Sequence, residues 1–502
     1  MKLSDALKIM VPVVAVFTVG MCIRDARQHG RERTSAPTHS AEPLGIYAPR
    51  APGLSRADAL AALEADARYR QARFTDAARP GYLWASSRVE MAEVAAMSPA
   101  RLYEVGAQLF HYRFGPAEGF GDREQAIPLR VHRGRHGGPD AYTCNDCHRR
   151  GGPAGAGSAA DNAYLEGDGQ RPEAALVRNP PALAGAGVLE LLAAEISRDL
   201  RALRTEATRK AEATGQVQRV ELTSKGIAFG ALTAGPDGSV DNREVKGVDP
   251  DLLVKPFGWS GHTVSLRAMV EDQLQIHHGM QTEHLAGEGD VARVGSFGGD
   301  DPDGDGVVRE ITEGQLTALT MYLAMQELPQ FDAPKDGRFL LKWAEGKERF
   351  EKLGCANCHV PAVTLERAVY RLPGRDGHPD ITVDLSEDGA APRLDEASEG
   401  GGFRVYLFSD LKRHVVGPNL RDVRAHRGVS PAAFMTPPLW GSSRSGPYMH
   451  DGRAPTLEEA IMAHSGEATE SQRAYAELDD ETKGAVRVYI NALTRAARFE
   501  AR

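Results

Sequence analysis

Two short runs of the sequence place cysteine and histidine at the same spacing. Residues 144–148 read Cys-Asn-Asp-Cys-His, and residues 355–359 read Cys-Ala-Asn-Cys-His. Two thiols one helical turn apart are spaced to form thioether bonds with the two vinyl groups of a haem, and the next histidine can bind its iron. The sequence therefore predicts two c-type haems. Their attachment residues would be Cys144, Cys147 and His148 for the first and Cys355, Cys358 and His359 for the second.

Other uses of paired cysteines explain these runs less well. Zinc ribbons also use Cys-x-x-Cys pairs, but those pairs usually lie about 15–20 residues apart and do not require a histidine after each. Here the two pairs are separated by more than two hundred positions. A thioredoxin-like redox pair would account for one run, but not for the histidine in both. Covalent haem uses every cysteine of the chain except Cys22.

A predicted helix after the second run ends in a histidine. Thr456 and Glu459 have the spacing of a capping box. Leu457, Ile461 and His464 then fall on one face of the helix that follows. His464 thus points with apolar residues, where a neutral imidazole would serve as the sixth ligand of the second iron. The alternative is a histidine that is packed in the core or stabilised at a helix C-terminus.

The first half repeats this arrangement. Ser265 starts a predicted helix whose apolar side includes Leu266 and Leu274, and which closes at His277 and His278. Either histidine could approach the first haem, as a ligand or as a proton carrier. Adjacent histidines at a helix end are also common on surfaces. The sequence leaves this choice open, with His277 as the candidate for a catalytic role.

The spacing of glycine and phenylalanine indicates a duplicated domain. Gly106 and Phe110 precede the first run, and Gly346 and Phe350 precede the second run, each pair in a Gly-x-x-x-Phe pattern. A chain of 502 residues is also too long for one small core. We therefore predict a mainly α fold with two cytochrome c-like haem domains related by duplication, with long loops and an N-terminal export segment. The predicted boundaries are 1–23 for a signal peptide or N-terminal anchor, 24–55 for a linker, 56–335 for a lead-in and the first haem domain, and 336–502 for the second haem domain.

The N-terminal residues predict export. Lys2 and Lys8 precede an apolar run from residue 9 to residue 23, which is short for a membrane span and typical of a signal-peptide core. No clear cleavage site follows, so an uncleaved anchor in the inner membrane is the alternative. Covalent haem attachment is normally completed outside the cytoplasm, which agrees with a location in the periplasm.

The overall charge bears on the partners. The formal net charge is -9, which gives no reason to expect nucleic acid. A mildly acidic surface suits a small basic redox partner, although most acidic proteins have none. The expected partners are therefore a small redox protein or a small-molecule oxidant or substrate.

An acidic loop has the pattern of a calcium site. Asp301, Asp303 and Asp305 alternate before Gly306, as carboxylates do in calcium loops. The twelfth position is Thr312 rather than an acid, so a full EF-hand is not expected. A looser calcium site and an acidic turn without an ion both fit the pattern.

Four further stretches resemble the bacterial di-haem cytochrome c peroxidase superfamily, and within it the di-haem oxidoreductase family that is also called the thiol oxidoreductases. They are Lys-Pro-Phe-Gly-Trp at 255–259, Phe-Ser-Asp-Leu-Lys-Arg-His at 408–414, Thr-Pro-Pro-Leu-Trp-Gly at 436–441 and Pro-Tyr-Met-His-Asp-Gly-Arg at 447–453. With the two haem runs, the resemblance spans about residue 100 to the C-terminus. It implies two cytochrome c-like domains that face each other, with electrons passing between the haems.

The resemblance also implies roles for individual positions. In the peroxidases the sixth ligand of the second haem lies fourteen positions after the histidine of the His-Asp-Gly turn. In this chain that histidine is His450, so the ligand position is His464, where the peroxidases have Met. A histidine pair implies a lower potential than Met would give, and it resembles the arrangement of the haem rubber oxygenases. The relatives also keep a tryptophan between the haems, which corresponds to Trp259.

The sequence departs from the peroxidases near the first haem. Their glutamine and their acid/base glutamate fall at Met269 and Gly279 of this chain. Cleavage of an O–O bond needs a group that moves a proton. Either His277 therefore replaces the glutamate, or peroxide is not the substrate.

These features together predict an exported di-haem c-type oxidoreductase. Electrons would pass from a closed second haem, which stores them, past Trp259 to a reactive and peroxidase-like first haem. One alternative is a haem oxygenase that resembles the rubber oxygenases and acts on an apolar substrate. The other is a non-catalytic electron-transfer or redox-sensing cytochrome in which His277 closes the first haem.

Overall fold

The computed structural model describes residues 88–122, 127–133, 138–288, 301–331, 334–389, 394–396 and 400–494. All of them belong to the unit Leu83–Arg502. The predicted export segment and linker lie outside the described residues. Helices occupy more of the described chain than strands do, which confirms the mainly α class. Each helix that the structure describes is too short or too polar to cross a membrane.

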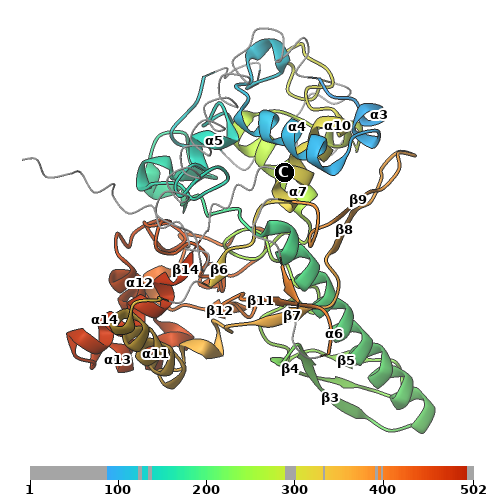
Figure 1. The fold of residues 1–502 in the computed structure, drawn as a ribbon. Coiled ribbons are helices and arrows are strands. Elements are labelled where there is room, and N and C mark those ends of the chain that lie inside the picture. Colours follow the sequence, from blue (N-terminus) through green and yellow to red (C-terminus); the bar gives the residue numbers. More distant parts are fainter. Residues whose placement is uncertain are drawn as a thin grey trace, which may run out of the picture. The chain divides into compact units, whose positions relative to one another are not determined.

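A first helical group carries the first Cys-x-x-Cys-His run. It consists of α3 (Met91–Ala95), α4 (Pro99–His111), α5 (Cys144–Cys147), α7 (Leu266–Gln273), the π-helical turn Leu274–His278 and α10 (Glu313–Ala324). Ser98 caps α4 by accepting a hydrogen bond from the Arg101 backbone N–H. α10 is buried along its whole length and packs against α4 (Figure 1). This packing makes α10 the centre of the first core.

A glycine sets the crossing of α4 and α10. Gly106 lies against Ala318 and Tyr322, and a Cβ atom at Gly106 would come within 2.2 Å of the Ala318 carbonyl oxygen. One turn later, the ring of Phe110 lies 5.3 Å from the ring of Tyr322. The glycine is needed because a larger residue would force the two backbones apart.

A second helical group carries the second run. It consists of α11 (Gly337–Lys352), the 3-10 turn η5 (Cys355–Asn357), α12 (Leu457–Ala463), α13 (Thr469–Ala476) and α14 (Asp480–Asn491). Gly346 of α11 lies against Ala485 and Tyr489 of α14, where a Cβ atom would come within 2.0 Å of the Ala485 carbonyl oxygen. The rings of Phe350 and Tyr489 are also 5.3 Å apart. Both Gly-x-x-x-Phe patterns therefore make the same helix crossing.

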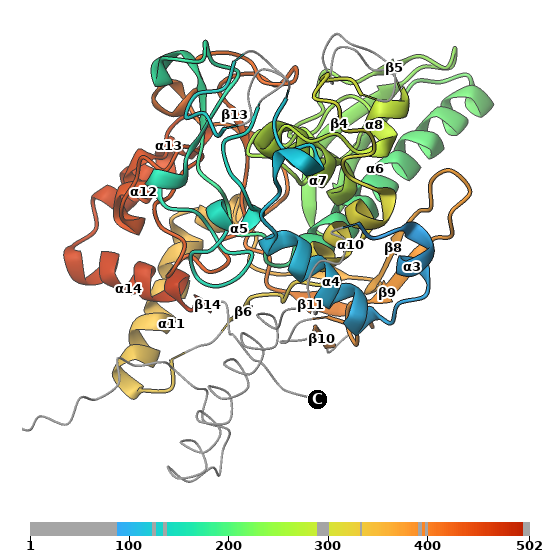
Figure 2. The ribbon, with the colours of Figure 1, turned by 90° about the horizontal axis from the view of Figure 1, so that it is seen from above.

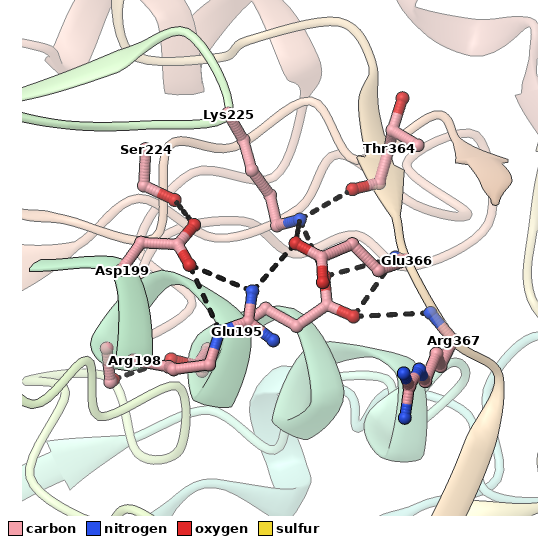
Figure 3. A network of polar contacts seen from close by, with 10 residues as sticks. Glu195, Arg198, Asp199, Ser224, Lys225, Thr364, Glu366 and Arg367 are labelled. Carbon is pink, nitrogen blue, oxygen red and sulfur yellow. Dashed lines mark hydrogen bonds and ion pairs between the residues drawn. The ribbon is translucent and has the colours of Figure 1, made fainter. Parts of the chain in front are cut away.

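A long helix and a small sheet form a third core, which the sequence did not predict. The elements are α6 (Ala186–Thr214), β3 (Gln218–Ser224), β4 (Ile227–Ala234) and β5 (Val240–Asp241), with the strands in the order β3-β4-β5. Lys225, at the β3–β4 turn, places its ammonium 2.6 Å from a Glu195 oxygen and 2.8 Å from the Thr364 carbonyl oxygen (Figure 3). These contacts fasten α6 and the hairpin to strand β7 (Val363–Leu365) of the second half.

Short antiparallel pairs connect these cores. The hairpin of β8 (Val369–Leu372) and β9 (Ile381–Asp384) buries Tyr370 and Val383 in the first core, beside α10 (Figure 2). Residues from the second half thus complete the first core. The remaining elements are α8 (Glu283–Glu288), β1 (Ala163–Leu165), β2 (Leu176–Arg178), β6 (Gln330–Phe331), β10 (Asp395–Glu396), β11 (Phe403–Val405), β12 (Arg413–Val415), β13 (Ala433–Met435) and β14 (Leu493–Thr494).

Candidate haem sites

Two imidazole rings face each other beside the second Cys-x-x-Cys-His run. The ring centroids of His359 and His464 are 6.4 Å apart, and the ring planes are inclined by 64°. His359 donates from Nδ1 to the Phe408 carbonyl oxygen at 3.0 Å, and His464 donates from Nδ1 to the Ala460 carbonyl oxygen at 2.8 Å. With both protons on Nδ1, each Nε2 atom carries a lone pair that can bind a metal.

The separation of these rings suits one metal ion between them. Bonds of about 2.0 Å from a metal to imidazole nitrogen place two opposite nitrogens about 4 Å apart and the ring centroids roughly 6 Å apart. Burial lowers the pKa of His359 to about 4, with a further contribution from His464, and burial also lowers the pKa of His464. Both rings are therefore neutral at pH 7, which is the form that binds iron.

The local sequence explains why His464 takes this position. Thr456 caps α12 by accepting from the Glu459 N–H, and the Glu459 carboxylate accepts from the Thr456 N–H, which is the predicted capping box. Leu457 and Ile461 pack on the core of the second helical group, beside Phe350 and Tyr489. α12 ends at Ala463, so His464 is its C-cap residue, and its ring meets that of His359 there.

A charged histidine lies beside the second run. His414 places Nε2 at 2.8 Å from an Asp410 oxygen and Nδ1 at 2.8 Å from a Glu467 oxygen. Burial opposes a charge on His414, but hydrogen bonds to Asp410, Cys358 and Glu467 raise its pKa to about 11. The imidazolium thus connects buried Asp410 to the segment that follows His464.

His148 of the first run is held in the same way as His359. Its Nδ1–H donates to the Pro181 carbonyl oxygen at 2.9 Å, and the Gly155 carbonyl oxygen lies 3.2 Å away. Burial lowers the pKa of His148 to about 4, so the ring is neutral and Nε2 can bind iron. An apolar ring, that of Phe110, lies beside His148 with the centroids 6.5 Å apart. His359, in contrast, is faced by an imidazole.

The cysteines of both runs are free thiols that thioether formation can consume. Burial raises the pKa of Cys144 and of Cys147 to about 12, and raises the pKa of Cys355 to about 11. Each run therefore offers two thiols and one neutral imidazole with its Nε2 free. These residues fit a covalently attached haem, whose iron takes axial nitrogen ligands.

The π-helical turn gives the two adjacent histidines of the first half different neighbours. His278 donates from Nδ1 to the Ala141 carbonyl oxygen at 2.9 Å and places Nε2 at 3.8 Å from the Cys144 sulfur. The His278 ring therefore lies beside the Cys144 sulfur, which would bond to the haem. Burial lowers the pKa of His278 to about 4, with a further contribution from His277.

Both ring nitrogens of His277 take part in hydrogen bonds. Nδ1 lies 2.9 Å from an Asp140 oxygen, and Nε2 lies 2.9 Å from Gln273 Oε1. The same Asp140 carboxylate accepts from His132 Nε2 at 2.9 Å. A nitrogen that already has a hydrogen-bond partner has no free lone pair for iron, so this arrangement fits a proton carrier better than an axial ligand.

The positions where the resemblance expects a glutamine and a glutamate have no such side chains. Gly279 ends the π-helical turn with φ of 69°, and a Cβ atom there would come within 2.6 Å of the Gly121 carbonyl oxygen. Met269 instead directs its sulfur toward the Gln273 amide, at 4.0 Å. The space for the glutamate is therefore closed by backbone, and His277, two positions before Gly279, is a nearby group that can move a proton.

Trp259 lies where the two halves of the chain meet. Its Nε1–H donates to the Asn179 carbonyl oxygen at 2.8 Å, and the Asn179 N–H donates to the His450 carbonyl oxygen at 2.7 Å. Asn179 is two positions from Pro181, which holds the first-run histidine. Trp259 thus connects the support of the first site to the His-Asp-Gly turn of the second half.

The predicted acidic loop is brought together with a further carboxylate. Oxygen atoms of Asp301, Asp303 and Asp305 lie within 4.8 Å of one another. Burial raises the pKa of Asp303 to about 7, and burial together with the charge of Asp303 raises the pKa of Glu310 to about 10. Gln281 joins the two, because its Nε2 donates to Asp303 and its backbone N–H donates to Glu310, both at 2.7 Å. A divalent cation would relieve the repulsion between these carboxylates.

Several side chains at these sites were not predicted in these roles from the sequence. Two of them had a signal in the spacing: Asp140 stands four positions before the first-run cysteine Cys144, and His414 stands four positions after Asp410. Glu310 and His132 had none, because their contacts depend on how distant loops fold.

Comparison with known proteins gives one family match. Residues 341–493 match a family model described as "Di-haem oxidoreductase, putative peroxidase". This range contains the second Cys-x-x-Cys-His run, His414 and His464. No curated protein sequence matches the chain.

Solved structures that are similar to the chain at low identity include the following three. Hydrazine synthase of Kuenenia stuttgartiensis, from a crystal pressurised with xenon, is 16% identical over 82% of this chain and 95% of its own, with a TM-score of 0.32. The diheme peroxidase BthA of Burkholderia thailandensis is 14% identical over 80% of this chain and 89% of its own, with a TM-score of 0.35. A MauG-like protein associated with microbial copper homeostasis is 15% identical over 52% of this chain and 78% of its own, with a TM-score of 0.26. At these scores nothing about activity follows for this chain.

Proposed function

We propose that the chain is an exported c-type di-haem oxidoreductase with a reactive first haem, since residues 341–493 match a family model described as "Di-haem oxidoreductase, putative peroxidase". The observation that carries this proposal is the difference between the two sites. The ring centroids of His464 and His359 are 6.4 Å apart, whereas among the described residues the ring beside His148 is that of Phe110. Two axial imidazoles close an iron to small ligands, and a single one leaves a position free. We therefore assign electron storage to the second site and reaction with an oxidant to the first.

The protein supplies attachment, orientation and electrostatics at both sites. Bound haem would supply the one-electron chemistry that the side chains lack. Carbonyl acceptors on Nδ1 fix the orientation of each ligand ring, and burial keeps these rings neutral. The first haem would be held by Cys144, Cys147 and His148, and the second by Cys355, Cys358, His359 and His464.

Two further residues have roles in this proposal. Trp259 lies on the route between the sites, because it is bonded to the support of the first site and, through Asn179, to the turn at His450. His277 moves a proton at the first site, since its position beside Asp140 and Gln273 gives it a fixed orientation. The substrate class is a small oxidant with an O–O bond, whose cleavage needs both electrons and a proton.

The alternatives make different predictions. A non-catalytic cytochrome closed by His277 is less well supported, because both nitrogens of that ring have hydrogen-bond partners. An oxygenase acting on an apolar substrate would share both haem sites. It differs in needing no external electron donor, so the dependence of turnover on a reduced donor separates the two activities.

The proposal includes a cation and a location. A calcium ion would bind at Asp301, Asp303 and Asp305, and the raised pKa values of Asp303 and Glu310 support a cation there. The predicted signal segment supports a periplasmic protein, either free or anchored by its N-terminus. The net charge of -9 supports a small basic electron donor as partner.

The test begins with the protein matured in a host that attaches c-type haem. We expect two haems per chain by pyridine haemochrome, and peroxide-dependent oxidation of a reduced small electron donor. The ferric protein should bind cyanide at one haem. If both haems were six-coordinate and inert to peroxide, cyanide and carbon monoxide, the reactive-site proposal would be wrong.

A further inference from the structure

Three side chains from separate segments meet beside the first haem run. Asp140 lies between His132 and His277, accepting from His132 Nε2 at 2.9 Å and from His277 Nδ1 at 2.9 Å. The two imidazole centroids are 6.0 Å apart. Asp140 and His132 are buried or nearly so, and Asp140 stands four positions before Cys144. The cluster therefore has a fixed place relative to the haem attachment site.

The backbone holds this cluster in register. The Gly138 N–H donates to the Ile276 carbonyl oxygen at 3.1 Å, and the Asp140 and Ala141 N–H groups donate to the His277 carbonyl oxygen at 3.0 and 3.3 Å. The segment before the first run is thus bonded to His277 twice, by its backbone and by the side chain of Asp140. These two attachments keep the Asp140 carboxylate next to the His277 ring. A preorganised site requires such a fixed position.

We propose that Asp140 and His132 are positioning residues that hold His277 as the proton donor of the first haem site. This inference rests on the function proposed above and deepens it. It names the groups that give His277 its orientation and its charge, in a chain whose Gly279 leaves no room for a glutamate.

The hydrogen-bond inventory supports a proton on each nitrogen of His277. Nδ1 faces the Asp140 carboxylate, which only accepts, and Nε2 faces Gln273 Oε1, which also only accepts. The Gln273 amide nitrogen is directed to the Met269 sulfur instead. Burial opposes the charge, but Asp140 raises the pKa of His277 above its ordinary value. The pair is therefore an imidazolium and a carboxylate.

The other titratable groups near His277 do not compete for this proton. His148 and His278 both have their pKa lowered to about 4, mainly by burial. His132 donates from Nε2 to Asp140, and its Nδ1 is buried without a hydrogen-bond partner among the described residues. The mobile proton of the cluster is therefore the one on His277.

The proposed step moves one proton and no electrons through these side chains. The Nε2 proton of His277 passes to an oxygen of the peroxide held at the first site, and the Nδ1 proton stays on the bond to Asp140. His277 becomes neutral, Asp140 remains a carboxylate, and water returns the proton afterwards. A donor of this kind contributes roughly 10²–10⁴-fold to such reactions.

The experiment measures the rate of cyanide binding to the ferric holoprotein as a function of pH. Cyanide arrives as HCN and must lose its proton to a nearby base, so binding accelerates where His277 loses its own proton. In Asp140→Asn, which keeps the shape and removes the charge, we expect this acceleration to move to lower pH by about one unit or more. His132→Phe removes a hydrogen-bond donor from Asp140, so the Asp140 carboxylate attracts the His277 proton more strongly. In this variant we expect the acceleration of cyanide binding to move to higher pH.

The matched control is Asp199→Asn. Asp199 of α6 is another carboxylate of the first half with a lowered pKa, but it accepts from Ser224 and Arg198 rather than from His277. Its cyanide profile should coincide with that of the wild type. If Asp140→Asn folded poorly, the upward shift in His132→Phe would still decide the question.

Two results would overturn the inference. One is a pH profile that is the same in the wild type, Asp140→Asn and His132→Phe. The other is a third metal ion per chain that is retained by the wild type and lost from both variants, since two imidazoles and a carboxylate can also bind a transition metal. Loss of haem or of cyanide binding in the wild type would instead contradict the proposed function, so the two failures are distinguishable.

Discussion

The imidazole rings of His359 and His464 have their centroids 6.4 Å apart, although His359 follows η5 and His464 follows α12, about a hundred residues later in the sequence. The carbonyl oxygens of Phe408 and Ala460 hold the two Nδ1 atoms. Each Nε2 lone pair is thereby free, and the two histidines would hold a single iron between them. This relationship supports a closed coordination of the second site, whereas among the residues that the structure describes the ring beside His148 is that of Phe110.

Replacing His464 by Met should raise the reduction potential of the second haem. A thioether ligand favours the reduced iron relative to imidazole. We expect a shift on the order of 100 mV, a fraction of the roughly 0.8 V over which axial ligands set haem potentials. A spectroelectrochemical titration measures it. The control is His378→Met at an exposed loop position, which should leave both potentials unchanged, and an unshifted His464→Met would argue against ligation.

His414 should stabilise the fold in a manner that depends on pH. Its pKa is about 11 in the folded chain, against an ordinary value of about 6.5. The folded state therefore binds the proton more tightly, so the added stability is complete below pH 6.5 and is lost as the pH rises through 11. His414→Gln should lower the free energy of unfolding by about 1–3 kcal/mol at pH 6. Urea titrations at pH 6 and pH 11 test this, and an equal loss at both would contradict the assignment.

The acidic loop should make stability depend on calcium and pH together. Asp303 and Glu310 have pKa values of about 7 and 10, both raised above the ordinary values of carboxyl groups. The folded chain without a cation therefore loses stability as the pH rises from about 4 to 10. Calcium should raise the melting temperature more at pH 8 than at pH 5. Asp303→Asn should weaken this effect, and the same calcium response in wild type and variant would exclude the site.

The helix crossing at Gly346 should tolerate no side chain. A Cβ atom there would come within 2.0 Å of the Ala485 carbonyl oxygen, so Gly346→Ala forces α11 and α14 apart. We expect a loss of about 1–3 kcal/mol in the free energy of unfolding, measured by denaturant titration of the holoprotein. Gly337→Ala is the matched control in the same helix, because a Cβ atom there meets nothing within 4 Å. A smaller loss for Gly346→Ala than for Gly337→Ala would refute the crossing as described.

The features that sequence could predict are those set by local spacing. The capping box at Thr456 and the helix that starts at Ser265 are confirmed, because each depends on residues within one or two turns. The mainly α class is confirmed, and the core of α6 with β3–β5 was missed. The haem attachment residues, the domain boundaries and the calcium site stay predictions.

The contacts that sequence could not predict join distant segments. Asp140 reaches the ring of His277 because the π-helical turn Leu274–His278 gives His277 and His278 different neighbours. The backbone of Gly138 and Asp140 also pairs with this turn. Glu310 meets Asp303 through Gln281, which lies more than twenty positions from either. Such contacts depend on the folded backbone, and no local period in the sequence reports them.

The electron paramagnetic resonance spectrum of the oxidised holoprotein at pH 7 tests the central claim most directly, recorded before and after addition of cyanide. The account predicts one low-spin iron with two axial imidazoles, which is indifferent to cyanide, and one iron that cyanide converts from high spin to low spin. The low-spin signal should disappear in His464→Gly. Two low-spin irons that ignore cyanide, or a mature chain that carries fewer than two haems, would contradict it.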